Sequence, residues 1–144
     1  MNIFATTTLR LIASLPSDLS YWDDPAFAPN NRHFAVATRD GWLHLWDLEG
    51  PRKIASLRGQ LLHIHWITFS PDGQRLVIGT GEGTVKIWDM TSLQEVATLR
   101  PGGEQRPVLS VLFSSSGDSV VAIKKNAAFV WTTPQTVRST SSKR

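Results

Sequence analysis

A repeat of about 42 residues constrains this chain more than any other feature of its sequence. Trp46 and Trp88 lie 42 residues apart, and Trp131 follows after a further 43. Other residues recur at offsets of 42 to 44, namely Phe27, Phe69 and Phe113, then Ala13, Ala55 and Ala97, and then Leu15, Leu57 and Leu99. Because several independent positions share one spacing, the chain consists of copies of a single structural unit. A unit of this length fits a four-stranded propeller blade and exceeds a helical hairpin repeat.

The residue types within each copy favour strands. The clearest copy runs from Ile67 to Asp89, where β-branched and aromatic runs are separated by Pro71-Asp72-Gly73 and by Gly81-Glu82-Gly83. Proline fixes φ and glycine accepts positive φ, so both triplets are typical of tight turns. No apolar stripe of helical period is long enough to compete with this pattern. We therefore expect an all-β fold in which helix is almost absent.

Aligned on the repeat, the copies predict twelve strands in about three four-stranded antiparallel blades. Subtracting one repeat from Trp46 gives Phe4, which marks the end of a third strand in a still earlier unit. After Trp131 the segment Gln135 to Ser139 has one apolar residue, so the last unit lacks a good fourth strand. The repeat region, residues 1–131, divides into a fourth strand at 9–15, a blade at 22–57, a blade at 64–99 and a partial blade at 108–131, followed by a Ser/Thr-rich basic tail at 132–144.

Two segments that end in Trp-Asp, Leu43-His-Leu-Trp-Asp47 and Val85-Lys-Ile-Trp-Asp89, resemble the WD-repeat (WD40) family of β-propellers, as does Phe69-Ser-Pro-Asp-Gly73. Two Trp-Asp ends at matching spacing make the signal specific. Since propellers have roughly four to eight blades, the resemblance implies a partial or open propeller of WD40 type. Residues expected to serve the architecture are Trp46, Asp47, Trp88, Asp89, Trp131, Asp40, Phe27, Phe69 and Phe113.

The family usually joins a histidine, a Ser or Thr, a turn aspartate and the third-strand tryptophan of each blade in a polar network. In this chain the turn position reads Asp40, Glu82 and Lys125 in the successive units, and the histidine position reads Asp18 and Gln60. No unit keeps the full set. Because a partly satisfied buried network lowers stability, we expect blades that depend on packing and turns.

Charge and composition exclude several function classes. The net charge of +3 comes from Arg138, Lys143 and Arg144, because the Lys/Arg and Asp/Glu residues of 1–131 cancel. A neutral body with a basic tail does not predict nucleic-acid binding, which needs a clustered basic surface. No apolar run approaches the roughly 18 residues of a membrane span, and no signal peptide is recognisable. The chain has no cysteine, which is compatible with a reducing compartment, so we expect a cytoplasmic protein without a membrane partner.

No catalytic constellation stands out in the sequence, so we expect no enzymatic activity and no cofactor. His63 and His65 form a His-x-His pair that could in principle join His44 at a metal, which would make this an enzyme or metal protein on a propeller scaffold. The alternative is that both histidines lie at an exposed strand end. Spacing alone favours that alternative, and no metal site is predicted.

The family resemblance places binding residues where first strands begin and just before the turns between second and third strands. A protein or peptide partner would then contact some of Asp23, Asp24, Arg39, His65, Trp66, Ser110 and Lys124. Trp66 and Arg39 are the strongest candidates, because tryptophan and arginine are enriched among interface hot spots. The alternative is that Trp66 only covers a blade edge.

Three functional hypotheses follow. The first is a protein-interaction scaffold or regulatory module that is part of a larger WD40 propeller protein. In the second, two copies associate to give six blades, with Leu9 to Leu15 pairing with Ala127 to Trp131. The third is the enzyme or metal protein that uses His63 and His65. The first is favoured, and it rests on the family resemblance, since a fold by itself does not define function.

Overall fold

The computed structural model describes residues 2–4, 8, 10–14, 25–38, 41–58, 63–102 and 105–132, and the regular elements among them are all strands. There are thirteen: β1 (Asn2–Phe4), β2 (Leu11–Ser14), β3 (Ala26–Phe27), β4 (His33–Ala37), β5 (Trp42–Asp47), β6 (Arg52–Arg58), β7 (Ile64–Phe69), β8 (Arg75–Thr80), β9 (Val85–Asp89), β10 (Gln94–Leu99), β11 (Ser110–Phe113), β12 (Ser119–Lys124) and β13 (Ala127–Thr132). The count exceeds the predicted twelve by β1, which contains Phe4, the position where the repeat predicts the end of a third strand.

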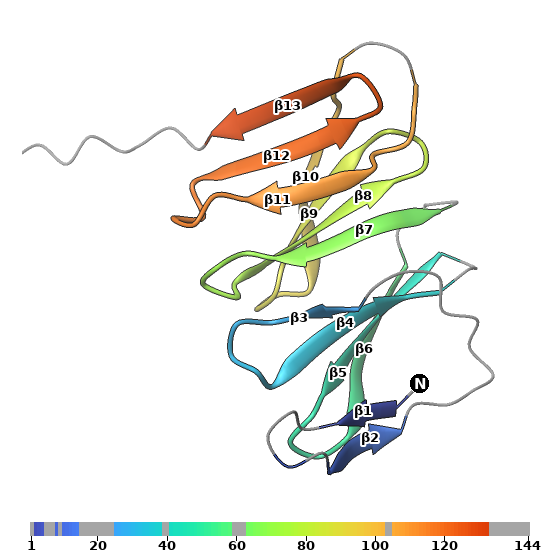
Figure 1. The fold of residues 1–144 in the computed structure, drawn as a ribbon, viewed down its shortest axis with the longest axis vertical. Coiled ribbons are helices and arrows are strands. Elements are labelled where there is room, and N and C mark those ends of the chain that lie inside the picture. Colours follow the sequence, from blue (N-terminus) through green and yellow to red (C-terminus); the bar gives the residue numbers. More distant parts are fainter. Residues whose placement is uncertain are drawn as a thin grey trace, which may run out of the picture.

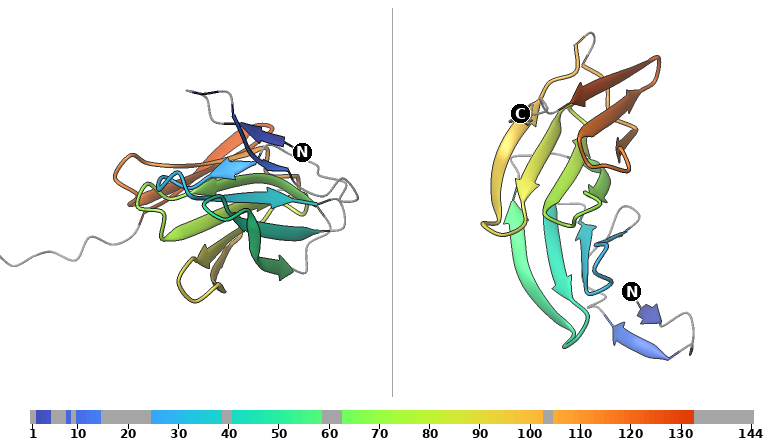
Figure 2. Two further views of the ribbon diagram at one scale, coloured as in Figure 1. Left: turned by 90° about the horizontal axis from the view of Figure 1, so that it is seen from below. Right: turned by 90° about the vertical axis from the view of Figure 1, so that its left-hand side faces the viewer.

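The strands form four separate antiparallel sheets that follow one another along the chain. Their orders are β1-β2, β3-β4-β5-β6, β7-β8-β9-β10 and β11-β12-β13. The sheets stack along the long axis of the molecule, from β1 and β2 at one end to β13 at the other (Figure 1). The fourth strands β6 and β10 lie along the same side of the stack (Figure 2). The predicted all-β fold with about three blades in an open arrangement is confirmed.

Glycines in the left-handed region close the hairpins between first and second strands in the second and third blades, and Asn31 takes that position in the first with a φ of 55°. Gly73 has a φ of 69° and donates its N–H to the carbonyl of Ser70 at 2.8 Å. One repeat later, Gly117 has a φ of 77° and donates to Ser114 at 2.9 Å. Residues with a Cβ rarely adopt these angles, so the glycines fix the turns that the sequence predicts.

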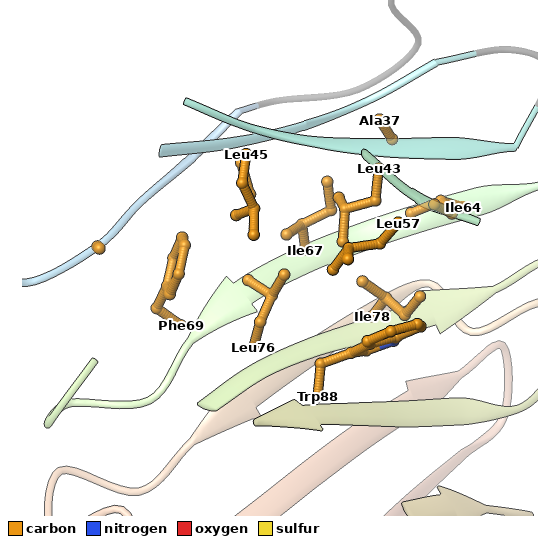
Figure 3. Packing of buried hydrophobic residues seen from close by; sticks show 12 residues of the cluster. Ala37, Leu43, Leu45, Leu57, Ile64, Ile67, Phe69, Leu76, Ile78 and Trp88 are labelled. Atoms are coloured by element: carbon orange, nitrogen blue, oxygen red, sulfur yellow. The ribbon is translucent and has the colours of Figure 1, made fainter. Parts of the chain in front are cut away.

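Apolar clusters fill each space between adjacent sheets. The central cluster joins the first and second complete blades, and Figure 3 shows Leu43 and Leu45 of one facing Ile67, Leu76 and Ile78 of the other. A second cluster joins the second and third blades, and a third joins β1 to the first blade. Each third-strand tryptophan packs toward the sheet that precedes it: Trp46 beside Ile3, Trp88 in the central cluster and Trp131 in the cluster between the second and third blades.

This packing predicts that a side chain at Gly79, which lies on β8 and faces the third blade, would destabilise the fold. A Cβ at this position would lie 2.7 Å from Cγ1 of Val108 and 3.0 Å from Cγ2 of Val111, and both valines are fully buried. We expect Gly79→Ala to lower the free energy of unfolding by about 1–3 kcal/mol, since overpacking a core displaces its neighbours. Urea unfolding measures this quantity.

The matched control is Gly50→Ala, because a Cβ at Gly50 would meet no atom within 4 Å. Its free energy of unfolding should stay within about 1 kcal/mol of the original chain. Equal losses in both variants would contradict the close packing of the second blade on the third.

Candidate functional site

The candidate site lies at the end of the blades where second strands turn into third strands. At this end Gly81 donates its N–H to the carbonyl of His63 at 2.8 Å. A Cβ at Gly81 would lie 3.1 Å from Nε2 of His65, so the imidazole packs closely against the turn. The two exposed histidine rings are 6.5 Å apart and meet edge to face. The turn thus lies beside two imidazoles that are close together at the surface.

The same turn also contacts the segment that enters the third blade. Gly83 has a φ of 82°, and a Cβ there would lie 2.5 Å from the carbonyl oxygen of Arg106. Two residues further on, Val108 donates its N–H to the carbonyl of Thr80 at 3.0 Å. The Arg106 side chain is exposed, as is that of Glu82 between the two glycines. We call the exposed set His63, His65, Glu82 and Arg106 the histidine rim.

Beneath the rim lie polar groups that the blades enclose. Thr80 and Thr84 are buried and share a hydrogen bond of 2.9 Å between their hydroxyl oxygens. Lys124 is only 6% exposed. Its Nζ lies 5.8 Å from the centre of the Phe129 ring and donates to the carbonyl of Pro101 at 3.4 Å. The Lys124 amine therefore lies below the surface that a partner could touch.

The other predicted binding residues are placed as follows. His65 stands on the rim, whereas Trp66 is half-buried and packs in the cluster between the second and third blades. Ser110 is half-buried on β11, opposite Ile123. Four predicted residues lie outside the part of the chain that the structure describes: Asp23, Asp24, Arg39 and the turn residue Asp40.

His44 does not join the rim histidines. It is buried in the first blade, shares a hydrogen bond of 2.9 Å with Oγ of Ser56, and stacks on Trp42 with ring centres 6.3 Å apart. Over residues 2–132, as far as they are described, no group of three His, Cys, Asp or Glu side chains could hold a metal ion. The structure therefore does not supply the three-histidine site that spacing alone leaves open.

Sequence reasoning missed Arg106 and Glu82 as surface partners of the histidines. Arg106 lies in a connection whose length differs between units, so the repeat gives no position for it. Glu82 was considered only as a departure from the family's aspartate. Its place between Gly81 and Gly83 predicts an exposed side chain, because a hairpin tip exposes its central residue.

The aspartates of the two Trp-Asp ends lie at the opposite end of the blades. Asp47 accepts two hydrogen bonds from the Arg32 guanidinium, at 3.1 Å and 2.8 Å, and one from the N–H of Glu49 at 3.0 Å. These bonds lower the pKa of Asp47 to about 2. Asp89 instead accepts from the N–H and hydroxyl of Ser92, at 2.8 Å and 2.9 Å, which lowers its pKa. Each carboxylate thus fixes the chain that leaves its third strand.

Two of the third-strand tryptophans bury an indole donor. Nε1 of Trp46 and Nε1 of Trp88 have no hydrogen-bond partner among the residues that the structure describes. Phe34 lies across the ladder from Trp46, and Leu76 lies across from Trp88. Both neighbours are hydrocarbon, so neither can accept the indole N–H. The network positions Asp18, Asp40 and Gln60 lie outside the described residues, so the incomplete polar network stays a prediction.

The fold and this site define a class of protein, an open stack of propeller blades with a polar rim at one end. The family described as "WD domain, G-beta repeat" matches residues 17–47 and 51–89. The chain belongs to the WD40-repeat family, whose repeats generally act as protein-interaction scaffolds. A comparison with curated proteins finds no match. None of the described residues forms a helix long and apolar enough to cross a membrane.

The two aspartates predict a selective pH effect. Arg32→Gln removes the guanidinium, so the pKa of Asp47 should rise from about 2 toward its usual value near 4, while the pKa of Asp89 should not change. A depressed pKa stabilises the fold above about pH 4, and this contribution is lost as the pH falls toward 2. The variant should therefore differ most from the original chain in stability near neutral pH.

Carboxyl NMR titration of the two aspartates measures both pKa values. The matched variant Ser92→Ala should raise the pKa of Asp89 and leave that of Asp47 low. If Arg32→Gln moved both values or neither, the separate anchoring of the two carboxylates would be wrong.

Proposed function

We propose that this chain is a non-enzymatic protein-interaction module of the cytoplasm, and that the histidine rim binds a protein or peptide. The observation that carries the proposal is the gathering of exposed polar side chains around one turn: the His65 imidazole lies close to Gly81, and the backbone of Arg106 lies against Gly83. The role of WD40 repeats as interaction scaffolds supports it. Backbone hydrogen bonds order the turn between these side chains, and an ordered backbone lowers the entropy cost of binding.

The chemistry of the rim suits a polar segment of mixed charge. Arg106 offers a cation, Glu82 offers a carboxylate, and the imidazoles can donate or accept hydrogen bonds. Half-buried Trp66 follows His65 in the chain and could add apolar area at the edge of the surface. We therefore propose an extended peptide or a protein loop with both charged and hydrogen-bonding groups as the ligand.

The ring of such a propeller needs more blades than the described residues form. We propose that this interaction module acts within a larger propeller whose remaining blades come from a longer polypeptide or from another copy of the chain. In either arrangement the histidine rim would stay at the end of the blades, away from the contacts between sheets.

Affinity enrichment with quantitative mass spectrometry tests the rim. The double variant His65→Ala/Arg106→Ala should lower the recovery of its bound proteins at least tenfold, because losing hot-spot side chains costs about 2 kcal/mol or more. The control Arg52→Ala/Gln74→Ala removes the same charge from exposed positions at the other end of the blades. This control variant should recover the bound proteins as well as the original chain does. Equal recovery by both variants and the original chain would overturn the proposal.

A further inference from the structure

At one position of the repeat, the side chain is buried in three sheets and exposed to solvent in the fourth. It is held by Ile3, Leu45, Ile87 and Val130, with exposed fractions of 9%, 1%, 8% and 62%. The first three belong to the same clusters as the tryptophan of the next sheet, which is Trp46, Trp88 and Trp131 in turn. Val130 is therefore at a position that elsewhere packs on the tryptophan of a following blade.

Val130 is part of a larger apolar face at the end of the third blade. Leu112 lies opposite Val121 in the ladder of β11 and β12, and Val121 lies opposite Val130 in the ladder of β12 and β13. Directly paired residues point to one side of a sheet, so the three side chains share a face. Leu112 is 48% exposed and Val121 is half-buried. We call Leu112, Val121 and Val130 the tail face.

The opposite end of the molecule shows the complementary gap. Phe27 is 51% exposed, whereas its repeat equivalent Phe69 is 7% exposed in the central cluster. Phe27 lies opposite Phe34, which lies opposite Trp46, so the three rings share one face of the first blade. At that face β1 contributes Ile3 to the cluster around Trp46, while Phe27 stays exposed. We call Phe27, Phe34 and Trp46 the head face.

Inside the chain, the residues equivalent to the head face of one blade pack on the residues equivalent to the tail face of the blade before it. Leu45 and Ala35 of the first blade share the central cluster with Phe69 and Trp88 of the second. The free tail face and the partly free head face are at opposite ends of the stack, so one molecule cannot join them (Figure 1). We propose that two copies of this chain associate head to tail, the tail face of each covering Phe27 of the other while β13 replaces β1 beside β2.

The strand exchange follows from which described strands make up the two end sheets. The third blade contains first, second and third strands, and β2 is a fourth strand whose partner β1 is only three residues long. The ladder of β1 and β2 pairs three residues, whereas β5 and β6 pair over six positions. β13 has six residues and places Val130 where β1 places Ile3. Combining β11, β12 and β13 of one copy with β2 of the other therefore completes a four-stranded blade.

Two such exchanges give six blades, which is within the range of closed propellers. Self-association of this kind goes beyond binding at the histidine rim, and neither depends on the other. It also covers the apolar tail face and the edge of β13 that pairs with no described strand, two features that soluble proteins generally protect.

Sedimentation velocity of the full chain tests the assembly. The original chain should sediment as a dimer, with twice the mass of one chain. Val130→Glu should sediment as a monomer, because the new charge would be buried in the contact. The control Val96→Glu places the same charge at a position that is 54% exposed on β10 and outside both end faces, and it should leave the dimer intact. A monomeric original chain, or a dimer unaffected by Val130→Glu, would overturn the proposal. The first result would favour coverage by blades of a longer polypeptide.

Engineered cysteines test the strand exchange, since the natural chain has no cysteine. Ala13 is the ladder partner of Ile3, so it should face Val130 of a second copy. Mild oxidation of mixed Ala13→Cys and Val130→Cys chains should give a disulfide-linked heterodimer, because opposed residues in antiparallel strands lie within disulfide reach. The same oxidation of mixed Ala13→Cys and Val96→Cys chains should give no disulfide-linked heterodimer. A dimer with no such link would show that β13 does not replace β1.

Discussion

Burial of both faces of each sheet is the constraint on which the rest of this structure depends. A blade made of β-branched, leucine and aromatic residues has apolar side chains on both sides, so it is stable only between neighbours. The second blade meets this condition, because the central cluster covers one face and the cluster with Val108 and Val111 covers the other. The first and third blades each keep one face partly open.

Apolar packing stabilises the blades around their tryptophans. Among the described residues, the indole N–H groups of Trp46 and Trp88 are buried without acceptors, and an unsatisfied buried donor costs about 1–3 kcal/mol. Fully buried neighbours such as Leu76 and Val36 offset that cost by filling the space around the rings. Polar interactions also fix the chain where the third strands end, since Asp47 pairs with Arg32 and Asp89 with Ser92.

The fold could be predicted closely because repeat spacing and strand alternation are physical properties of the sequence itself. The offset from Trp46 to Phe4 located β1, and Pro71-Asp72-Gly73 located a turn. Alternation could also have shown that Lys124 points inward, since it follows buried Val120 and Ala122 at intervals of two. The position of Arg106 could not be predicted, because it depends on a bond between Val108 and Thr80 that joins two blades.

Native-state hydrogen exchange, followed at low and high protein concentration, tests the central claim that covered faces stabilise the blades. Amides of β8 and β9, in the blade covered on both sides, should exchange slowly at both concentrations. Amides of β13 should exchange quickly in dilute solution and slowly when a second copy covers the tail face. If β13 were as protected as β8 in dilute solution, the dependence of blade stability on a covering neighbour would be contradicted.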